Sequence, residues 1–456
     1  MTAGLRPGID TSAARLGPFW LSPGISRGNA LTLFFSGFSL ICLFTFMSFV
    51  QPYLLQEVLH IPKDQQGSLT GLLGVVHEVV VLSLVSLIGG SSDRFGRRVV
   101  YVTGVCLLAA GFALYPMAET PMQLIAFRVF YAVGFAASSV MLHTCLAEYP
   151  QNAVRGRWMG TAAVLNALGV TVMAFALSRL PAWYVGLGFD EVLAARLSFW
   201  TFSGYLLALA VLLRVGLAPG TEHVNRRESL LKIVSRGFVA ARDNPRIRLS
   251  YAMAFASRGD LVVLTVYFSL WVVQAGHDQG MTAAEATAKA GMLFGLSQAA
   301  GLLWSYPIGV IIDRINRLTG MCIAFGLATA GYFALGLIGD PFGKVMLAAC
   351  LLVGMGESSV MVAGGTMVGQ EAPAESRGAV LGTFSLMGAL GMMLLTFTGG
   401  IIFDQIGRTS PFLMMGAVNG LVLLAALGLR RSERIAASRL AAESAVQAST
   451  QPDSSS

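Results

Sequence analysis

Twelve apolar runs follow one another along this sequence, each about as long as the ~20 residues that a helix needs to cross a bilayer. They lie at 30–52, 67–90, 98–118, 121–146, 157–179, 196–214, 249–273, 290–312, 319–338, 344–369, 378–402 and 411–429. Only 12% of the 456 residues are charged, about half the share found in soluble globular chains. We therefore expect an all-α integral membrane protein with 12 transmembrane helices and no separate soluble domain.

The positive charges indicate how the chain is inserted, because cytoplasmic loops hold an excess of Lys and Arg. If both termini are cytoplasmic, the inside segments hold 23 of the 31 Lys and Arg and the outside segments hold 6, while Arg128 and Arg258 lie within runs. The net charge of +7 then reports topology rather than nucleic-acid binding. We expect a multi-pass protein of the cytoplasmic (inner) membrane with both termini inside. We expect no cleaved signal in the first 28 residues, because the first apolar run is longer than the core of a signal peptide. The five cysteines lie within apolar runs, so we also expect no disulfide.

The runs divide the chain into five segments. These are a cytoplasmic N-terminal segment 1–28, a six-helix bundle 29–214, a cytoplasmic linker 215–248, a second six-helix bundle 249–430 and a disordered cytoplasmic tail 431–456. In the linker, Leu230, Val234 and Phe238 recur near helical spacing beside basic residues, which predicts an amphipathic helix on the lipid surface. A regulatory helix is the alternative. The Ala- and Ser-rich tail has little apolar area to bury, hence the expectation of disorder.

A short connection between the second and third runs occurs twice. Residues 89–98 read Gly-Gly-Ser-Ser-Asp-Arg-Phe-Gly-Arg-Arg, and residues 309–318, 220 positions later, read Gly-Val-Ile-Ile-Asp-Arg-Ile-Asn-Arg-Leu. Two connections further on, Arg155-Gly156 corresponds to Arg377-Gly378. One six-helix unit is therefore present twice.

The string Gly-x-x-x-Asp-Arg-x-Gly-Arg-Arg resembles the signature loop of the major facilitator superfamily of transporters, and the resemblance covers essentially the whole chain. It implies the fold of that family, two pseudo-symmetric six-helix bundles, and a loop whose acid and arginines bridge the halves and bias the equilibrium between two open states. On this basis the gating residues are Gly89, Asp93, Arg94, Gly96, Arg97 and Arg98, with Gly309, Asp313, Arg314 and Arg317 in the second copy. Asn316 replaces the second glycine there. The alternative is that the arginines are only topology anchors.

Charged residues at membrane depth normally face a cavity or a partner. There are five, Glu78, Arg128, Arg258, Asp260 and Glu357, and the repeat offset makes Gln298 the counterpart of Glu78. In the fold that the chain resembles, the helices that hold them surround a central cavity. We therefore predict that these six residues bind substrate or protons, and that one of the three acids carries a coupled proton.

Structural alternatives exist for several of these residues. Glu78 could form an interhelical hydrogen bond, and Arg128 could form a salt bridge with Glu78 or Asp260. Gly259, between Arg258 and Asp260, could mark a local break in the helix or allow close helix packing.

These features predict a secondary transporter that exports an amphiphilic compound in exchange for protons. The antiporter signature expected in the fifth helix is incomplete, because Gly160 and Gly169 are present but Met173 and Ala174 stand at later positions of the pattern. Proton-coupled uptake of an organic acid or sugar is the alternative, since two arginines could hold a carboxylate. A membrane enzyme or a receptor on a transporter scaffold is a remote alternative, because we find no metal motif and no nucleophile elbow. We expect no metal, no cofactor and no enzymatic activity, a monomer, and as partners a small-molecule substrate, protons and membrane lipid.

Overall fold

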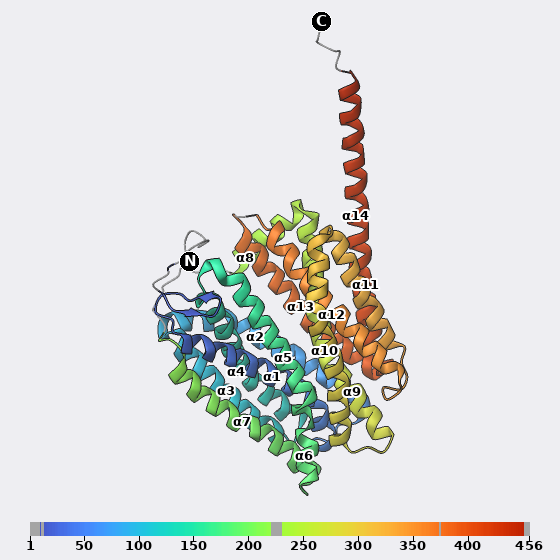
Figure 1. The fold of residues 1–456 in the computed structure, drawn as a ribbon. Helices are drawn as coiled ribbons and strands as arrows, with labels where there is room; N and C mark the ends of the chain where they lie inside the picture. Colours follow the sequence, from blue (N-terminus) through green and yellow to red (C-terminus); the bar gives the residue numbers. More distant parts are fainter. Residues whose placement is uncertain (1–9, 11–12, 220–229, 374, 451–456) are drawn as a thin grey trace.

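The computed structural model describes residues 10, 13–219, 230–373 and 375–450, nearly all of them helical (Figure 1). Strands β1 (Arg15–Leu16) and β2 (Phe19–Trp20) pair as a short antiparallel hairpin before the first helix. The helices, with 3-10 turns labelled η, are α1 (Arg27–Glu57), α2 (Lys63–Phe95), α3 (Arg97–Leu114), η1 (Tyr115–Met117), α4 (Pro121–Glu148), η2 (Asn152–Val154), α5 (Arg155–Phe175), η3 (Leu177–Arg179), α6 (Leu180–Gly186), α7 (Glu191–Gly216), α8 (Leu230–Asp243), α9 (Pro245–Asp278), α10 (Ala283–Arg314), α11 (Arg317–Gly336), α12 (Val345–Glu371), α13 (Arg377–Gln405) and α14 (Ser410–Thr450).

Twelve helical segments of the described chain are long and apolar enough to cross a membrane, which confirms the predicted number of spans. The fifth span is not the single helix expected at 157–179. It consists of η2, α5, η3 and α6, with the interruption after Phe175. Pro181 lies just beyond the interruption, and a proline lacks the N–H for an intrahelical bond and crowds the carbonyl one turn earlier. The helix therefore breaks on the N-terminal side of the proline.

A single residue, Gly96, connects α2 to α3. Its φ angle of 88° is one that residues with a side chain rarely adopt. This explains why the signature loop holds a glycine between two long helices, and it fixes the positions of Asp93 and Arg97 on either side of a sharp turn.

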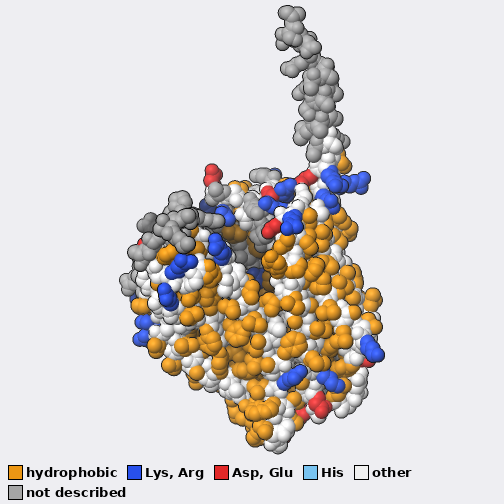
Figure 2. All heavy atoms as spheres, viewed as in Figure 1, with side chains coloured by type: hydrophobic (Ala, Val, Ile, Leu, Met, Phe, Trp, Pro, Cys, Tyr) orange, Lys and Arg blue, Asp and Glu red, His pale blue; other side chains and the backbone are white. Residues whose placement is uncertain are grey.

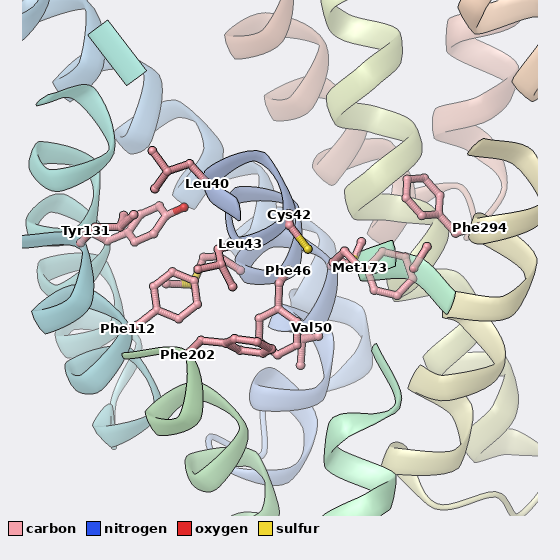
Figure 3. Close-up of a cluster of buried hydrophobic side chains, with 14 of the residues drawn as sticks. Leu40, Cys42, Leu43, Phe46, Val50, Phe112, Tyr131, Met173, Phe202 and Phe294 are labelled. Carbon is pink, nitrogen blue, oxygen red and sulfur yellow. The ribbon is translucent and has the colours of Figure 1, made fainter. Parts of the chain in front are cut away.

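The N-terminal half (α1–α7) packs around α1, which is buried along most of its length. Figure 3 shows Leu40, Leu43 and Phe46 of α1 facing aromatic side chains of neighbouring helices. The ring of Phe46 lies 4.5 Å from that of Phe202 on α7 and 6.5 Å from that of Phe112 on α3, measured between centroids. These aromatic contacts pack α1 against α3 and α7 in the core of the N-terminal half.

Both termini lie at the same end of the bundle, which we call the terminal end; the other end is the opposite end (Figure 1). The C-terminal half comprises α9 to α14, and α13 packs against α2 of the N-terminal half while α10 packs against α5. Figure 2 shows the molecule hollowed between the halves at the terminal end. The arrangement of the helices in two bundles agrees with the predicted fold class.

The linker contains the predicted amphipathic helix in part. Helix α8 is present and packs on α13, and the hydroxyl of Tyr251 on α9 donates to the carbonyl of Gly237, 3.0 Å away. Residues 220–229 of the predicted linker lie outside the described residues. Helix α8 is therefore attached to the C-terminal half, and Phe238 and Val239 are exposed on it.

The expected disorder of the tail 431–456 is wrong for most of its length. Helix α14 leaves the membrane-spanning bundle and continues to Thr450 (Figure 1). Residues 431–450 include six alanines, three arginines and two glutamates, which are strong helix formers. The spanning part of α14 supplies the nucleus, so each further residue adds a hydrogen bond without the cost of starting a helix. Residues 451–456 lie outside the described residues.

Candidate functional site

Arg128 on α4 is a buried cation in the N-terminal half, with 6% of its surface exposed. Its guanidinium carbon lies 5.2 Å from the ring centre of Tyr131 and 6.0 Å from that of Tyr115, within the range of cation–π contact. Among the residues that the structure describes, its Nε and Nη1 atoms have no hydrogen-bond partner. Two donor nitrogens of a permanently charged group are therefore unpaired there, in a largely water-excluded position.

Glu78 on α2 is half-buried and interacts electrostatically with both Arg128 and Arg258. No ion pair joins it to either arginine in the part of the chain that the structure describes, so the predicted alternative of a salt bridge from Arg128 to Glu78 or Asp260 is wrong for this conformation. His77, next to Glu78, is buried instead between the rings of Tyr131 and Phe135. One acid thus faces two cations, without direct contact.

Arg258 and Asp260 project from opposite sides of α9, as their spacing predicts. Arg258 is exposed, and its aliphatic part lies against Gly388 of α13, whereas Asp260 has 0% exposure. Helix α9 runs without interruption from Pro245 to Asp278, so the predicted local break at Gly259 is wrong. A Cβ atom at Gly259 would collide with Leu395, which identifies this glycine as a close-packing position.

Asp260 lies inside the C-terminal half rather than in the hollow, which corrects its predicted place in a central cavity. Asn419 of α14 donates from Nδ2 to its Oδ1 atom, 2.7 Å away, and the hydroxyl of Tyr332 on α11 donates to its backbone oxygen, 3.0 Å away. Helices α11 and α14 hold no charged residue at this depth, so these partners were missed. The available signal was an asparagine inside an otherwise apolar run.

Glu357 on α12 has 8% exposure and accepts a hydrogen bond from Nε2 of Gln298 on α10, 3.2 Å away. Gln298, the predicted counterpart of Glu78 in the second half, thus contacts another of the predicted site residues. Glu357 also interacts electrostatically with Asp260. The six predicted residues therefore form two groups, one around Glu78 and the arginines and one within the C-terminal half.

The first signature loop lies at the terminal end and forms a charge cluster. Arg97 contacts Asp93 through Nη1 and Glu148 of α4 through Nη2, the latter at 3.0 Å. Arg98 donates to the carbonyl of Leu217, 3.4 Å away. Arg94 stacks on the neighbouring Phe95. Glu148 was missed by the sequence analysis.

The second copy of the loop is arranged differently. Asp313, Arg314 and Arg317 are exposed, Gly309 is half-buried, and Asn316 caps the start of α11. The charge cluster at this end of the C-terminal half is formed by other residues, described next.

Arg246 of α9 contacts Glu371 of α12 and Glu433 of α14, each at 2.8 Å. Glu371 follows Glu148 by 223 positions, close to the repeat offset, so the duplication itself was the signal for both glutamates. In each half, a glutamate at the corresponding position of the repeat, Glu148 or Glu371, thus pairs with an arginine of another helix at the terminal end.

The halves contact each other at the opposite end through polar groups. Both carboxylate oxygens of Asp404 on α13 accept backbone N–H groups of α2, from Gly67 at 2.8 Å and Ser68 at 2.6 Å. Asp278 at the end of α9 pairs with Lys63 of α2, also at 2.6 Å. We call these contacts, with Gln274 donating to Gln66 at 3.0 Å, the interhalf seal.

Close backbone packing completes the interhalf seal. A Cβ atom at Gly291 of α10 would meet the carbonyl of Ala174 and the side chain of Ser178 in the N-terminal half, and one at Gly400 of α13 would meet the backbone of Gly67. Small residues of this kind let helices of the two halves approach closely. None of these residues was predicted, because their contacts join segments far apart in the sequence.

Comparison with known proteins agrees with this architecture. The family model described as Major Facilitator Superfamily matches residues 32–341 and 287–453. A crystal structure of the nucleoside transporter NupG superposes with a TM-score of 0.69 at 14% identity, covering 88% of this chain and 98% of that one. A POT family transporter gives a TM-score of 0.64 at 13% identity, covering 87% and 95%. At such low identity these structures show the fold alone.

Several curated proteins are similar in sequence. Magnetosome protein MamH of Paramagnetospirillum magneticum is 28% identical over 420 residues, which cover 90% of this chain and 94% of that protein. Magnetosome protein MamZ of Magnetospirillum gryphiswaldense is 28% identical over 391 residues, and the match covers 83% of this chain but 59% of MamZ. Multidrug resistance protein MdtH of Aeromonas hydrophila is 25% identical over 380 residues, covering 79% of this chain and 87% of MdtH.

Proposed function

Because the chain belongs to the major facilitator superfamily, we propose that it exports a small amphiphilic organic compound across the cytoplasmic membrane in exchange for protons. The observation that carries the proposal is the asymmetry between the two ends of the molecule. The halves are joined by the interhalf seal at the opposite end and separated by a hollow at the terminal end (Figure 2). A protein that binds solute in such a hollow, closes that end and then opens the other end carries the solute across the membrane.

The proposed direction of transport, export, depends on the side of the membrane to which the hollow opens. The excess of Lys and Arg in the predicted inside segments, 23 against 6, supports a cytoplasmic location of the terminal end. A solute would then enter from the cytoplasm in the conformation described here. Similarity to proteins named Multidrug resistance protein MdtH supports export.

Proton coupling is supported by acids that have no ion pair at membrane depth. Glu78, Asp260 and Glu357 all lie within spans, and none of them forms an ion pair in the described part of the chain. Taking a carboxylate out of water favours its protonated form. An acid that gains and loses a proton as the two ends open in turn provides the coupling.

The test is transport in inside-out vesicles that hold the purified chain, with ethidium as the first probe. A pH gradient that is acid inside drives accumulation, and dissipating the gradient with a protonophore abolishes it. Substitution of the coupling acid by its amide leaves exchange of internal and external ethidium intact but removes accumulation. Accumulation that continues after both proton and sodium gradients are dissipated would contradict the mechanism.

Proton-coupled uptake of an organic acid is the second candidate function, and one observation favours it. Arg128 has two buried donor nitrogens without a partner among the described residues, and Arg258 is a second cation within electrostatic reach of Glu78. The three charges sum to one positive charge, which suits a carboxylate held by the guanidinium fork.

A thermal-shift screen of the purified chain against organic anions, sugars and lipophilic cations separates the two candidates, because a ligand that binds the folded state raises its melting temperature. For an anion, Arg128→Lys lowers affinity selectively, since an ammonium group lacks the planar fork. Stabilisation by cations alone, unchanged by Arg128→Lys, would exclude the organic-acid function.

A further inference from the structure

Two buried oxygen atoms in the C-terminal half lack a hydrogen-bond donor. Asn419 Nδ2 donates to Asp260 Oδ1 at 2.7 Å and to the carbonyl of Met415 at 3.0 Å. A carbonyl only accepts hydrogen bonds, so the second bond fixes which end of the amide is the nitrogen. Within the described residues, Asp260 Oδ2 and Asn419 Oδ1 are buried and have no partner. Buried polar atoms are nearly always satisfied, so this pair requires an explanation.

A proton on Asp260 satisfies both atoms. Once protonated, Asp260 Oδ2 becomes a donor. Asn419, which already donates to Asp260 Oδ1, offers its unpaired Oδ1 as the acceptor. A carboxylic acid and a primary amide then form two hydrogen bonds side by side. A carboxylate offers only acceptors, so the amide oxygen stays unpaired beside it.

Burial and the neighbouring acid Glu357 favour the same neutral form of Asp260. The residue has 0% exposure, and the titratable groups that interact with its carboxyl are Glu357 of α12 and Tyr332 of α11. Helix α14 contributes the neutral Asn419, and Arg258 of α9 points to the other side of its helix, where it is exposed. Two buried acids near each other, without a cation, do not readily ionise together.

We propose that Asp260 is a proton-binding site in which Asn419 holds the neutral carboxyl group. We further assign to it the coupled proton, and this second step rests on the proposed function. The other two acids have different surroundings. Glu78 has two arginines within electrostatic reach, which oppose the effect of burial on its carboxyl group, and Glu357 already accepts a hydrogen bond from Gln298.

Infrared spectroscopy of the purified full chain in lipid vesicles tests the site, because protonated carboxyl groups absorb apart from carboxylates. We expect a protonated-carboxyl component at neutral pH, where exposed carboxyl groups are ionised. Asp260→Asn removes this component, and the fold is retained because an asparagine can form the same two bonds with Asn419. The matched control is Asp340→Asn, an exposed acid of the same half. A spectrum that Asp260→Asn leaves unchanged in folded protein overturns the site.

The coupling has its own test, which uses no substrate. Gly291→Ala forces the halves apart at the interhalf seal, whereas Gly326→Ala places its Cβ in open space and serves as the control. If the proton is the coupled one, the pH at which the infrared component disappears shifts in Gly291→Ala, because protonation and conformation are linked. Asp404→Ala provides a second variant that weakens the same seal.

The outcomes separate the two steps of the proposal. An unshifted pH in both variants, when hydrogen exchange shows that the seal has opened, makes Asp260 a structural acid and overturns the coupling. A pH gradient that fails to drive transport contradicts the proposed function and leaves the proton-binding site in place.

Discussion

Asp404→Ala is the perturbation that tests most directly how the opposite end is held closed. The Asp404 carboxylate on α13 accepts two backbone N–H groups near the start of α2, at 2.8 and 2.6 Å, and so joins the two halves. The N-terminal end of a helix also carries a partial positive charge that a carboxylate stabilises. Alanine removes both acceptors and the charge without adding bulk.

A hydrogen bond to a charged group contributes about 1.5–3 kcal/mol. Because water replaces part of this when the seal opens, we take about 2–4 kcal/mol for the two bonds together, and 1.4 kcal/mol corresponds to tenfold in an equilibrium constant. The closed population at the opposite end should therefore fall by roughly 30- to 1,000-fold relative to the open one. Lys63→Ala should matter less: Lys63 and Asp278 are 36% and 43% exposed, and exposed pairs contribute about 0–1 kcal/mol.

Hydrogen exchange measured by mass spectrometry on peptides that cover 63–72 reports the opening, because these amides exchange when the seal separates. Asp404→Asn keeps one acceptor and should give an intermediate rate. The control is Glu119→Ala, an exposed acid at the same end of the bundle. Exchange in Asp404→Ala within twofold of wild type, in protein of unchanged helicity, would show that the seal is held by other contacts.

Three further changes follow from the structure. Asp93→Asn weakens the contact with Arg97 and should lower the transport rate per folded molecule without loss of folded yield; unchanged transport would reduce the loop to a topology anchor. Gly291→Ala overpacks the interhalf seal, which costs about 1–3 kcal/mol, and should increase hydrogen exchange in 290–296 while Gly326→Ala does not. Arg246→Ala breaks contacts with two glutamates of α12 and α14 and should lower the melting temperature by a few degrees, as about 1 kcal/mol at a partly exposed cluster implies; an unchanged melting temperature would show that the cluster does not stabilise the half.

The sequence by itself determined the number of spans, the duplication and the fold class. Each of these depends on local composition, because a bilayer requires about 20 apolar residues at every crossing whatever the neighbouring helices are. The glycine of the signature loop was equally readable, since Gly96 adopts a backbone conformation that other residues avoid. Helical spacing also predicted that Arg258 and Asp260 project from opposite sides of α9.

Only the tertiary structure decided which of the charged residues meet. Asp260 is buried because Asn419, 159 positions away, packs beside it, and the interhalf seal joins Asp404 to Gly67, 337 positions apart. Helix spacing gives the direction of a side chain from its own helix, but its partner depends on the rotation and depth of another helix. Close packing of small residues and the approach of the two halves set both quantities, and neither leaves a periodic signal in the sequence.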